Sequence, residues 1–486
     1  MNIPSPSSTV EPRPWQTGVA PVFIGVFLWV AFFDQIGRRA LPAGGLGWSI
    51  LGAAAAGPLC YLLLFRTPAL WGHRTGKTLS SLASGTFGLR GSGIVPGVLL
   101  GIGQVVLFAV AVGYAVDLTF QGLAMARMID PRSLRPIAVG DSTVKPPIYL
   151  VTALFWAIAT ALVSLKLVRW IGFLMHFFPI FPAVMLGGIM LATMGGLRYS
   201  EPGGDIPVAA AAARGAFLMT FQWIFSFAAI CGLIGVDWGA GSVSARDVRI
   251  GGWVGIGLAP AIVAALALIA VAGHQGGARE RNLEEARFSR STIRDLPTPA
   301  GSGLDAPAST FRAVLIEGFD RRVACLMLLT FGLASLAPAC FASFVFGERF
   351  AAAGPGVSRL AWTMLGATTA WFLIVGGWAD RTETVFDLLG AAFAPAVGAI
   401  AADACRQRGG WSGPRRGVNP AGLIAWAVGL AVGLAPTLAP IVRVDALARV
   451  QPASLWAFLA AFAVFTALSL LRIESAVGTE ETGMKY

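Results

Sequence analysis

Charged residues are scarce in this sequence of 486 residues, and their scarcity excludes a large soluble protein. Only 13% of the residues are Asp, Glu, Lys or Arg, whereas 56% are hydrophobic. A soluble chain normally carries about 25% charged residues, because these cover its water-facing surface. Apolar stretches of about 20 residues recur instead, and a helix of this length crosses the hydrocarbon core of a bilayer. The sequence therefore predicts an all-α membrane protein with many transmembrane helices.

The residue patterns of catalytic, metal and nucleotide sites are also missing. The three His residues are far apart, and the five Cys residues lie in or beside apolar stretches without paired spacing. Cysteines so placed are typical of small hydrophobic residues in helix packing. There is no Ser-His-Asp arrangement, no HExxH motif and no P-loop. We therefore expect neither an enzyme nor a resident metal or cofactor, and we expect a gradient rather than ATP to drive any transport.

The net charge of +11 does not indicate a nucleic-acid partner. The Lys and Arg residues lie between apolar stretches, where they set the orientation of membrane helices, and they form no basic stripe with interleaved aromatic residues. Their distribution places both termini in the cytoplasm and the protein in the cell membrane. The expected partners are the lipid bilayer and a small-molecule substrate, and the sequence does not determine the oligomeric state.

Twelve apolar stretches make up most of the chain. They cover approximately residues 19–40, 47–65, 94–122, 148–167, 170–194, 216–237, 251–273, 323–346, 359–378, 384–404, 420–441 and 453–471. The long polar insert 274–322 mixes both charges and then turns to Pro, Gly and Ser, which predicts a short surface helix followed by a flexible linker. Residues 1–18 are rich in Pro and Ser and predict a disordered tail, and residues 472–486 form a C-terminal tail.

Polar residues inside apolar stretches are costly in a membrane, so each is a candidate for function. The first stretch contains Asp34, followed by Gln35 and by Pro42. One interpretation is an interrupted helix whose freed backbone groups bind an ion or a substrate, as in many transporters. The other is an ion pair between Asp34 and Arg38, one helical turn on. The sequence leaves both open.

Further polar side chains lie in the third, sixth and eighth stretches. Gln104 stands alone in the third, and Gln222 in the sixth is followed by a Trp, two Phe and a Ser. Amide and aromatic groups placed together suit a planar heterocycle, although Gln between helices and Trp at the interface are also common in structural roles. In the eighth, Pro338 lies between Ser335 and Ser343, and a proline leaves one backbone carbonyl free.

Two segments resemble the nucleobase:cation symporter family, the permeases for cytosine, purines, uracil, allantoin, hydantoins and thiamine. The loop at residues 72–92 carries, at the family's spacing, Gly72, Gly76, Phe87, Gly88 and Gly91, with Ser84 where the family has Arg. The tenth stretch and the one after it carry Pro395, Gly398, Asp403, Arg408, Asn419, Gly422 and Trp426 in matching positions. A weaker similarity covers residues 235–255, which include Asp237.

This resemblance implies a LeuT-type fold of two inverted five-helix repeats, 19–194 and 216–404, followed by two additional helices in 420–471. Helices one and six would be broken at the substrate site. The implied function is a permease that imports a nucleobase or similar small heterocycle by alternating access, coupled to H⁺ or Na⁺. Asp237 would then lie at the cytoplasmic end of helix six, within reach of Arg246 or Arg249.

The candidate site residues follow from these patterns together. Those predicted to bind substrate are Trp29, Gln104, Phe108, Gln222, Trp223, Phe227 and Ser343. Those predicted to couple an ion or proton are Asp34 and Ser335, and those predicted at gates or helix ends are Asp237, Arg246 and Asp403.

Two departures from the family bear on this assignment. The third helix has Phe108 as its nearest aromatic where the family carries a Trp, and the eighth has Ala337 and Pro338 where sodium-coupled members carry hydroxyls. Proton coupling through Asp34 is therefore the favoured hypothesis. The same departures support an alternative, a non-transporting sensor or structural membrane protein derived from such a permease.

Overall fold

The computed structural model describes residues 12–134, 137–139, 142–166, 179–200, 210–292, 310–354 and 356–478. Within this part of the chain, ten helical segments are long and apolar enough to cross a membrane, and a bent pair near the N-terminus makes an eleventh. The shorter apolar helix α17 (Arg359–Val375) accounts for the remaining predicted stretch. The predicted multi-pass, all-α architecture is confirmed, with one short hairpin of β1 (Ile137–Val139) and β2 (Ser142–Val144).

The first half of the chain forms five spans. Its elements are α1 (Val19–Phe27), α2 (Val30–Phe33), α3 (Ile36–Leu59), the π-helix η1 (Cys60–Phe65), α4 (Arg66–Thr75), α5 (Leu79–Phe87), α6 (Leu89–Ser92), the π-helix η2 (Gly93–Leu99), α7 (Leu100–Met125), the 3-10 turn η3 (Pro131–Leu134), α8 (Pro147–Lys166), α10 (Ile180–Thr193) and the 3-10 turn η4 (Met194–Tyr199). Helix α3 is kinked at Gly44 and Gly45, where Gly45 has a φ of 80° that favours glycine. The predicted stretch 170–194 begins outside the described residues, which resume at Pro179.

The second half forms the other spans. Its elements are α11 (Ala210–Ala240), α12 (Ala245–Gly252), the π-helix η5 (Trp253–Leu258), α13 (Ala259–Thr292), α14 (Phe311–Glu317), α15 (Arg321–Ala334), α16 (Leu336–Ala353), α17, α18 (Thr382–Arg406), α19 (Pro420–Val442), α20 (Asp445–Ala448) and α21 (Ala453–Leu470). Several of these helices have an N-cap residue whose side-chain hydroxyl accepts a hydrogen bond from a backbone N–H of the first turn. Thr310 caps α14 in this way, Ser244 caps α12 and Ser358 caps α17.

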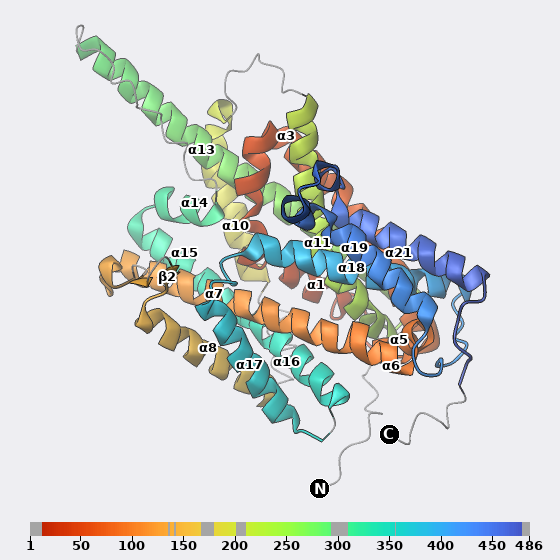
Figure 1. The fold of residues 1–486 in the computed structure, drawn as a ribbon. Coiled ribbons are helices and arrows are strands. Elements are labelled where there is room, and N and C mark those ends of the chain that lie inside the picture. Colours follow the sequence, from red (N-terminus) through yellow and green to blue (C-terminus); the bar gives the residue numbers. More distant parts are fainter. Residues whose placement is uncertain are drawn as a thin grey trace.

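The helices divide into two packed groups (Figure 1). In the first, called the bundle here, α11 packs along α3 and α4, and α1 packs against η5 and α13. In the second, called the scaffold, α7 and α8 pack with α15, α16 and α17. Helix α18 lies against α11, and the last two long helices, α19 and α21, pack on α18. The bundle and the scaffold meet at α1 and α2, where the first span is interrupted.

The interruption of the first span lies at Leu28 and Trp29, where Trp29 has extended backbone angles and the two helices meet at 51°. The sequence predicted breaks in the first and the sixth span. The break in the first is present, but the sixth span, α11, is one continuous helix from Ala210 to Ala240. A second interruption occurs instead at Ser335, between α15 and α16 and three residues before Pro338. A proline destabilises the helical turn that precedes it, so Pro338 explains why the helix is interrupted at this position.

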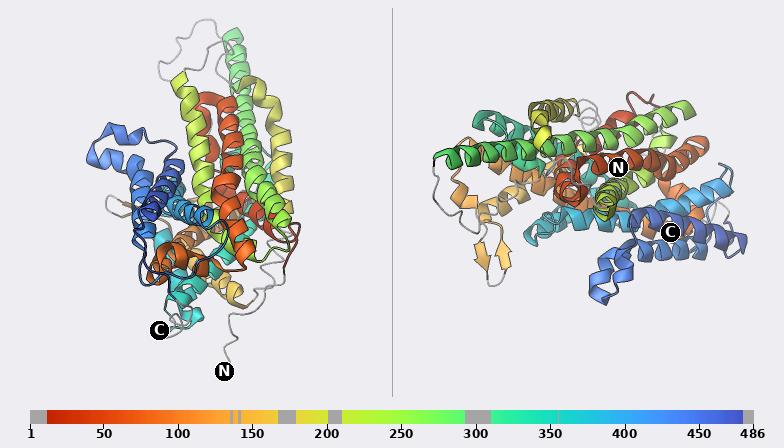
Figure 2. Two further views of the ribbon diagram at one scale, coloured as in Figure 1. Left: turned by 90° about the vertical axis from the view of Figure 1, so that its right-hand side faces the viewer. Right: turned by 90° about the horizontal axis from the view of Figure 1, so that it is seen from above.

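The polar insert differs from its prediction. Helix α13 continues without interruption to Thr292, and Figure 2 shows it projecting past the neighbouring helices. No separate surface helix begins after residue 274, because the helical run of the seventh span extends into the insert. The predicted linker at 293–309 lies outside the described residues, and α14 follows it as a short helix against α13.

Parts of both predicted tails are ordered. Arg13 exchanges backbone hydrogen bonds with Gly241 and Val243, in the turn between α11 and α12. At the other terminus, backbone bonds join residues 476–478 to Pro414 and Arg416, between α18 and α19. These backbone groups are hydrogen-bonded to the protein, whereas those of a disordered tail are hydrogen-bonded to water. The remaining tail residues, 1–11 and 479–486, lie outside the described part of the chain.

Candidate functional site

A cavity of about 50 Å³ lies beside the break in the first span. It is lined from the bundle by α1 and α11 and from the scaffold by α7 and α16. The lining residues are Val22, Phe23, Val26, Trp29, Gln104, Leu107, Phe227, Ile230, Cys231, Ile234, Trp238, Pro338, Phe341 and Ala342. One water molecule needs roughly 10–15 Å³ by the same measure. The cavity therefore has room for a few waters, and a heterocycle would enter only if the helices moved apart.

The described residues of the cavity walls carry little polarity and no charge. None of the lining residues is Asp, Glu, Lys, Arg or His. Trp29 is 4% exposed, and its indole Nε1 has no hydrogen-bond partner. Gln104 is 2% exposed, lines the same cavity and makes no hydrogen bond to any described residue. Buried polar groups are normally paired, and two on one cavity that lack a partner among the described residues indicate a place for a ligand.

Aromatic rings close the cavity at the break. The ring of Phe227 lies 5.0 Å from that of Phe32 and 4.8 Å from that of Phe386, centroid to centroid. The indole of Trp29 lies 6.5 Å from the ring of Tyr114 in an edge-on arrangement. These distances are within the range of favourable aromatic pairs, so the rings form a packed layer. Tyr114 connects this layer to a polar network, because its ring packs against Trp29 and its hydroxyl donates a hydrogen bond to Asp34.

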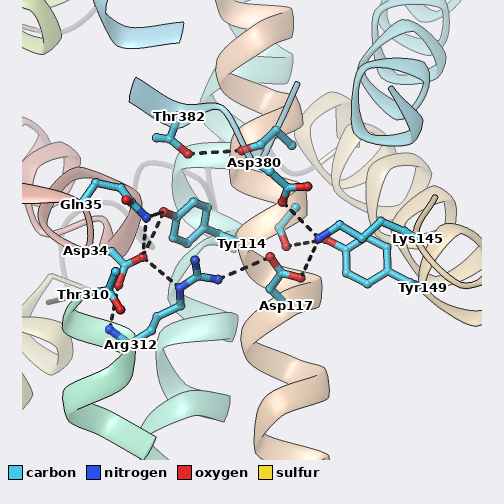
Figure 3. A network of polar contacts seen from close by, with 12 residues as sticks. Asp34, Gln35, Tyr114, Asp117, Lys145, Tyr149, Thr310, Arg312, Asp380 and Thr382 are labelled. Atoms are coloured by element: carbon cyan, nitrogen blue, oxygen red, sulfur yellow. Dashed lines mark hydrogen bonds and ion pairs between the residues drawn. The ribbon is translucent and has the colours of Figure 1, made fainter. Parts of the chain in front are cut away.

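Asp34 is the centre of that network, shown in Figure 3. Its carboxylate is fully buried and accepts hydrogen bonds from the Arg312 backbone N–H at 2.7 Å, from the Arg312 Nε at 2.9 Å and from the Tyr114 hydroxyl at 3.1 Å. Gln35 Nε2 donates a fourth at 3.1 Å. Burial lowers the pKa of the Arg312 guanidinium, but Asp34, Tyr114 and Asp117 together more than reverse this, and the pKa lies above its ordinary value. The partner of Asp34 is thus Arg312 and not Arg38, which is exposed.

The network continues across the end of the scaffold. Arg312 Nη1 reaches Asp117 Oδ2 on α7 at 3.5 Å, and Lys145, which follows β2, joins Asp117 at 3.7 Å and Asp380 at 3.1 Å. We call these residues and Asp34 the insert-side closure, because Arg312 lies in the polar insert. The closure joins α2 of the bundle to α7 of the scaffold through α14. Breaking a buried ion pair leaves an uncompensated charge, so this end opens only when the whole set rearranges.

A second closure lies at the opposite end of the cavity. Asp237, near the end of α11, accepts a hydrogen bond from Arg349 Nη2 on α16 at 2.9 Å and another from the Leu79 backbone N–H at 2.7 Å. Leu79 begins α5, and a carboxylate is favourable at a helix N-terminus. Arg349 also donates to Ser80 Oγ at 3.0 Å. We call Asp237, Arg349, Leu79 and Ser80 the terminus-side closure, because the ordered tail segments contact loops at this end.

The other predicted helix-end residues lie apart from this closure. Arg246 and Arg249 are exposed on α12, so the predicted partners of Asp237 are replaced by Arg349. Asp403 is fully buried near the end of α18, where it accepts hydrogen bonds from Thr86 at 2.9 Å and from Gln407 at 2.8 Å. Asp403 therefore joins α18 to α5 and does not reach the cavity.

Of the residues predicted to bind substrate, Trp29, Gln104 and Phe227 line the cavity. Gln222 and Trp223 do not. The Gln222 amide exchanges hydrogen bonds with Ser454 Oγ at 3.0 Å and with the Ser454 backbone N–H at 3.1 Å, which fixes α11 to α21. Trp223 Nε1 donates to the Phe32 carbonyl at 2.8 Å and so holds α2 in place.

Phe108 and Ser343 are also absent from the cavity lining. Phe108 packs edge-on against Phe346, and Ser343 Oγ donates to the Cys340 carbonyl within its own helix. The predicted coupling residue Ser335 lies at the break between α15 and α16, and its hydroxyl donates to the Phe331 carbonyl. The three residues are buried, and two of them satisfy their hydroxyls locally.

A smaller cavity of about 20 Å³ lies where the two helix breaks face each other. Its described lining residues are Gly25, Leu28, Trp29, Pro179, Pro182, Ala334, Ala337 and Pro338, and none of them carries a side-chain oxygen. Hard cations take oxygen ligands, which these residues could supply only from the backbone. Among the described residues, no group of three His, Cys, Asp or Glu side chains could hold a metal ion.

Sequence reasoning missed the basic partners of both closures. Arg312 lies in the insert, 278 residues from Asp34, and Arg349 lies 112 residues from Asp237. Neither arginine is placed at a helical spacing, such as three or four residues, from the acid that it binds, so local sequence patterns do not identify the pair. The available signal was the presence of single basic residues beside the eighth span, opposite two intramembrane acids.

The bundle, the scaffold and the broken first span together define the LeuT-type fold. Two solved structures of Mhp1, a nucleobase-cation-symport-1 family transporter, share it. The closed conformation with bromovinylhydantoin bound matches with a TM-score of 0.60 and 16% identity, over 96% of this chain and 95% of that one. The inward facing conformation matches with a TM-score of 0.60 and 16% identity, over 99% and 97%.

The likeness to Mhp1 shows the fold and no more at this identity. A manganese transporter of Eremococcus coleocola, in complex with an aromatic bis-isothiourea substituted compound, matches less well, with a TM-score of 0.49 and 13% identity over 97% of this chain and 99% of that one. No family model and no curated protein sequence matches the chain.

Proposed function

We propose that this protein is a secondary active transporter that moves a small planar heterocycle across the cell membrane by alternating access. The observation that carries the proposal is a cavity at a helix break whose described lining residues carry no charge. Arg312 of α14 closes one end by pairing with Asp34 of the bundle and Asp117 of the scaffold, and the pair of Asp237 with Arg349 closes the other. Transporters of this architecture bind substrate near the middle of the membrane and expose it to one side at a time.

The two closures are the proposed gates. Opening the insert side requires Asp34 to separate from Arg312, and opening the terminus side requires Asp237 to separate from Arg349. Each separation exposes one end of the same cavity. A substrate that binds one open state more tightly shifts the equilibrium toward that state by its difference in affinity. We place the terminus side, with both termini, in the cytoplasm.

The coupling ion we propose is the proton, carried by Asp34. A proton on this carboxylate would remove the charge that holds Arg312, so proton binding and opening of the insert side would be linked. The absence of side-chain oxygens from the small cavity at the facing breaks favours a proton over sodium. Nucleobases remain one candidate group within the heterocycles.

Uptake into proteoliposomes tests the proposal. Radiolabelled uracil, hypoxanthine, hydantoin, thiamine and quinolin-2-one are offered under an inward proton gradient, an inward sodium gradient or no gradient. We expect at least one compound to accumulate above its external concentration under the proton gradient. Asp34→Asn should abolish this accumulation, because the amide cannot carry the proton. The matched control is Asp445→Asn, which changes an exposed carboxylate on α20 outside both closures and should retain the accumulation.

Two results would contradict parts of the proposal. Accumulation that survives both Asp34→Asn and collapse of the proton gradient would exclude proton coupling through this residue. Binding of a compound without accumulation under any gradient would exclude transport of that compound and favour the alternative of a sensor with a transporter fold.

A further inference from the structure

We propose that the cavity takes an uncharged, mainly apolar molecule with no more than two hydrogen-bonding groups. This inference deepens the proposed function and rests on it for the site, but its chemistry is read from the cavity walls alone. A nucleobase with polar atoms on every edge, or a charged heterocycle, is then a poor ligand.

The described residues that line the cavity offer no counter-ion to an ionic ligand. None of them is charged, and the acids nearest to each end of the cavity are already paired. Asp34 accepts four hydrogen bonds, two of them from Arg312, and Asp237 is held by Arg349. A charged group placed in such a cavity would lose its hydration without gaining a counter-ion.

The unpaired polar groups set the number of hydrogen bonds. Trp29 Nε1 is a donor only, and it lacks a partner in the closed cavity. The Gln104 amide can both donate and accept, and it too has no partner among the described residues. The other polar side chains among the described lining residues are the indole of Trp238, which is only partly buried, and the thiol of Cys231, which is a weak donor. A ligand with one carbonyl that accepts from Trp29 and one N–H that donates to the Gln104 amide would satisfy both.

The rest of the cavity is an apolar slot along α1. Val22 and Val26 form one wall, and Ile230 and Ile234 face them from α11. Phe341 on α16 closes the scaffold side. Each polar ligand atom that met these walls would lose its water without a replacement, which is unfavourable. An apolar ring or substituent gains from the same contacts.

Three bicyclic probes of similar size separate the alternatives. Quinolin-2-one is neutral and has one lactam edge, hypoxanthine is neutral and polar on all edges, and quinoline-2-carboxylate keeps the apolar rings but carries a charge. Binding is measured as the rise in unfolding temperature of the purified protein across a range of concentrations, since a ligand of the folded state stabilises it. We expect quinolin-2-one to stabilise the protein at concentrations at least about 10-fold lower than the other two.

Variants assign the hydrogen bonds. Trp29→Phe removes the N–H and keeps an aromatic ring, and Gln104→Leu removes the amide. Each should weaken quinolin-2-one binding about 10-fold, the effect of one neutral hydrogen bond. The matched control is Trp411→Phe, because the indole Nε1 of Trp411 also lacks a partner but lies outside the cavity lining. This control should bind like the unchanged protein.

Tighter binding of hypoxanthine or quinoline-2-carboxylate than of quinolin-2-one would overturn the inference, as would equal stabilisation by all three or by none. Unchanged binding in both Trp29→Phe and Gln104→Leu would also overturn it. The uptake assay distinguishes an error in the cavity chemistry from an error in the transport proposal. Accumulation of hypoxanthine alone would refute the cavity chemistry and leave transport standing. Selective binding of quinolin-2-one without accumulation would refute its transport and support the cavity chemistry.

Discussion

At the scale of single residues, each acid predicted inside or near the membrane has a specific partner. Asp237, which follows a run of Gly, Ile and Val, binds the first N–H of α5 and the guanidinium of Arg349. The sequence predicted its position at a helix end correctly. It could not predict Arg349, because ion pairs between distant helices depend on tertiary packing and leave no local spacing.

The Asp237 pair can be tested by a double-mutant cycle. Asp237→Asn and Arg349→Gln should each lower the free energy of unfolding by about 1–3 kcal/mol, since each leaves a partly buried charge without its partner. The double variant should lose less than the sum, by about 0.5–3 kcal/mol. Unfolding in detergent solution provides the measurement. Arg246→Gln, on the exposed face of α12, is the control and should be neutral, whereas additive losses in the cycle would show that the pair is not coupled.

At the scale of helices, the sequence predicted the number and order of spans better than their interruptions. Apolar length alone marks a span, so the count follows from composition. The break at Trp29 has no Pro beside it and is held by a distant contact, from Trp223 Nε1 to the Phe32 carbonyl. Helix α11 stays continuous because its glycines serve close packing instead of a break. A Cβ on Gly239 would lie 2.0 Å from the Ala69 carbonyl oxygen of α4.

Gly239→Ala tests this packing. The added methyl group must push α11 away from α4, and overpacking of this kind costs roughly 1–3 kcal/mol. We expect a lower unfolding temperature and a correspondingly lower yield of folded protein. Gly187→Ala on α10 is the matched control, because nothing lies within 4 Å of the added Cβ. A loss of stability in Gly187→Ala as large as in Gly239→Ala would contradict the proposed cause.

At the scale of the whole molecule, the two closures lie at opposite ends of one cavity and join the same two helix groups. This arrangement was not predictable from the sequence, because it depends on Arg312 from the insert and Arg349 from α16 meeting acids on the bundle. The fold class was predictable, since it follows from the order of spans and the family-like segments. Of the seven residues predicted to bind substrate, the three on the cavity wall come from three different helices.

The native Cys231, which lines the cavity and is 4% exposed, can report which end is open. In proteoliposomes of known orientation, a membrane-impermeant thiol reagent should label it slowly. Arg349→Gln should raise the labelling rate about 10-fold from the terminus side, and Arg312→Gln should do so from the insert side, if each pair contributes about 1.4 kcal/mol to closure. Cys231→Ser versions of both variants correct for labelling of Cys405, which is exposed. Faster labelling from the same side in both variants would refute the opposed gates.

The length of α13 has a practical consequence for imaging. The helix has 34 residues, about 50 Å at 1.5 Å per residue, whereas the hydrocarbon core of a bilayer is about 30 Å thick. A membrane protein of 50.7 kDa offers little outside a detergent micelle to align particles in electron microscopy. The projecting turns of α13 offer a site at which a fused or bound marker would report the orientation of the bundle. Bound nearer to α14, the same marker would hold the insert side shut and trap one conformer for reconstruction.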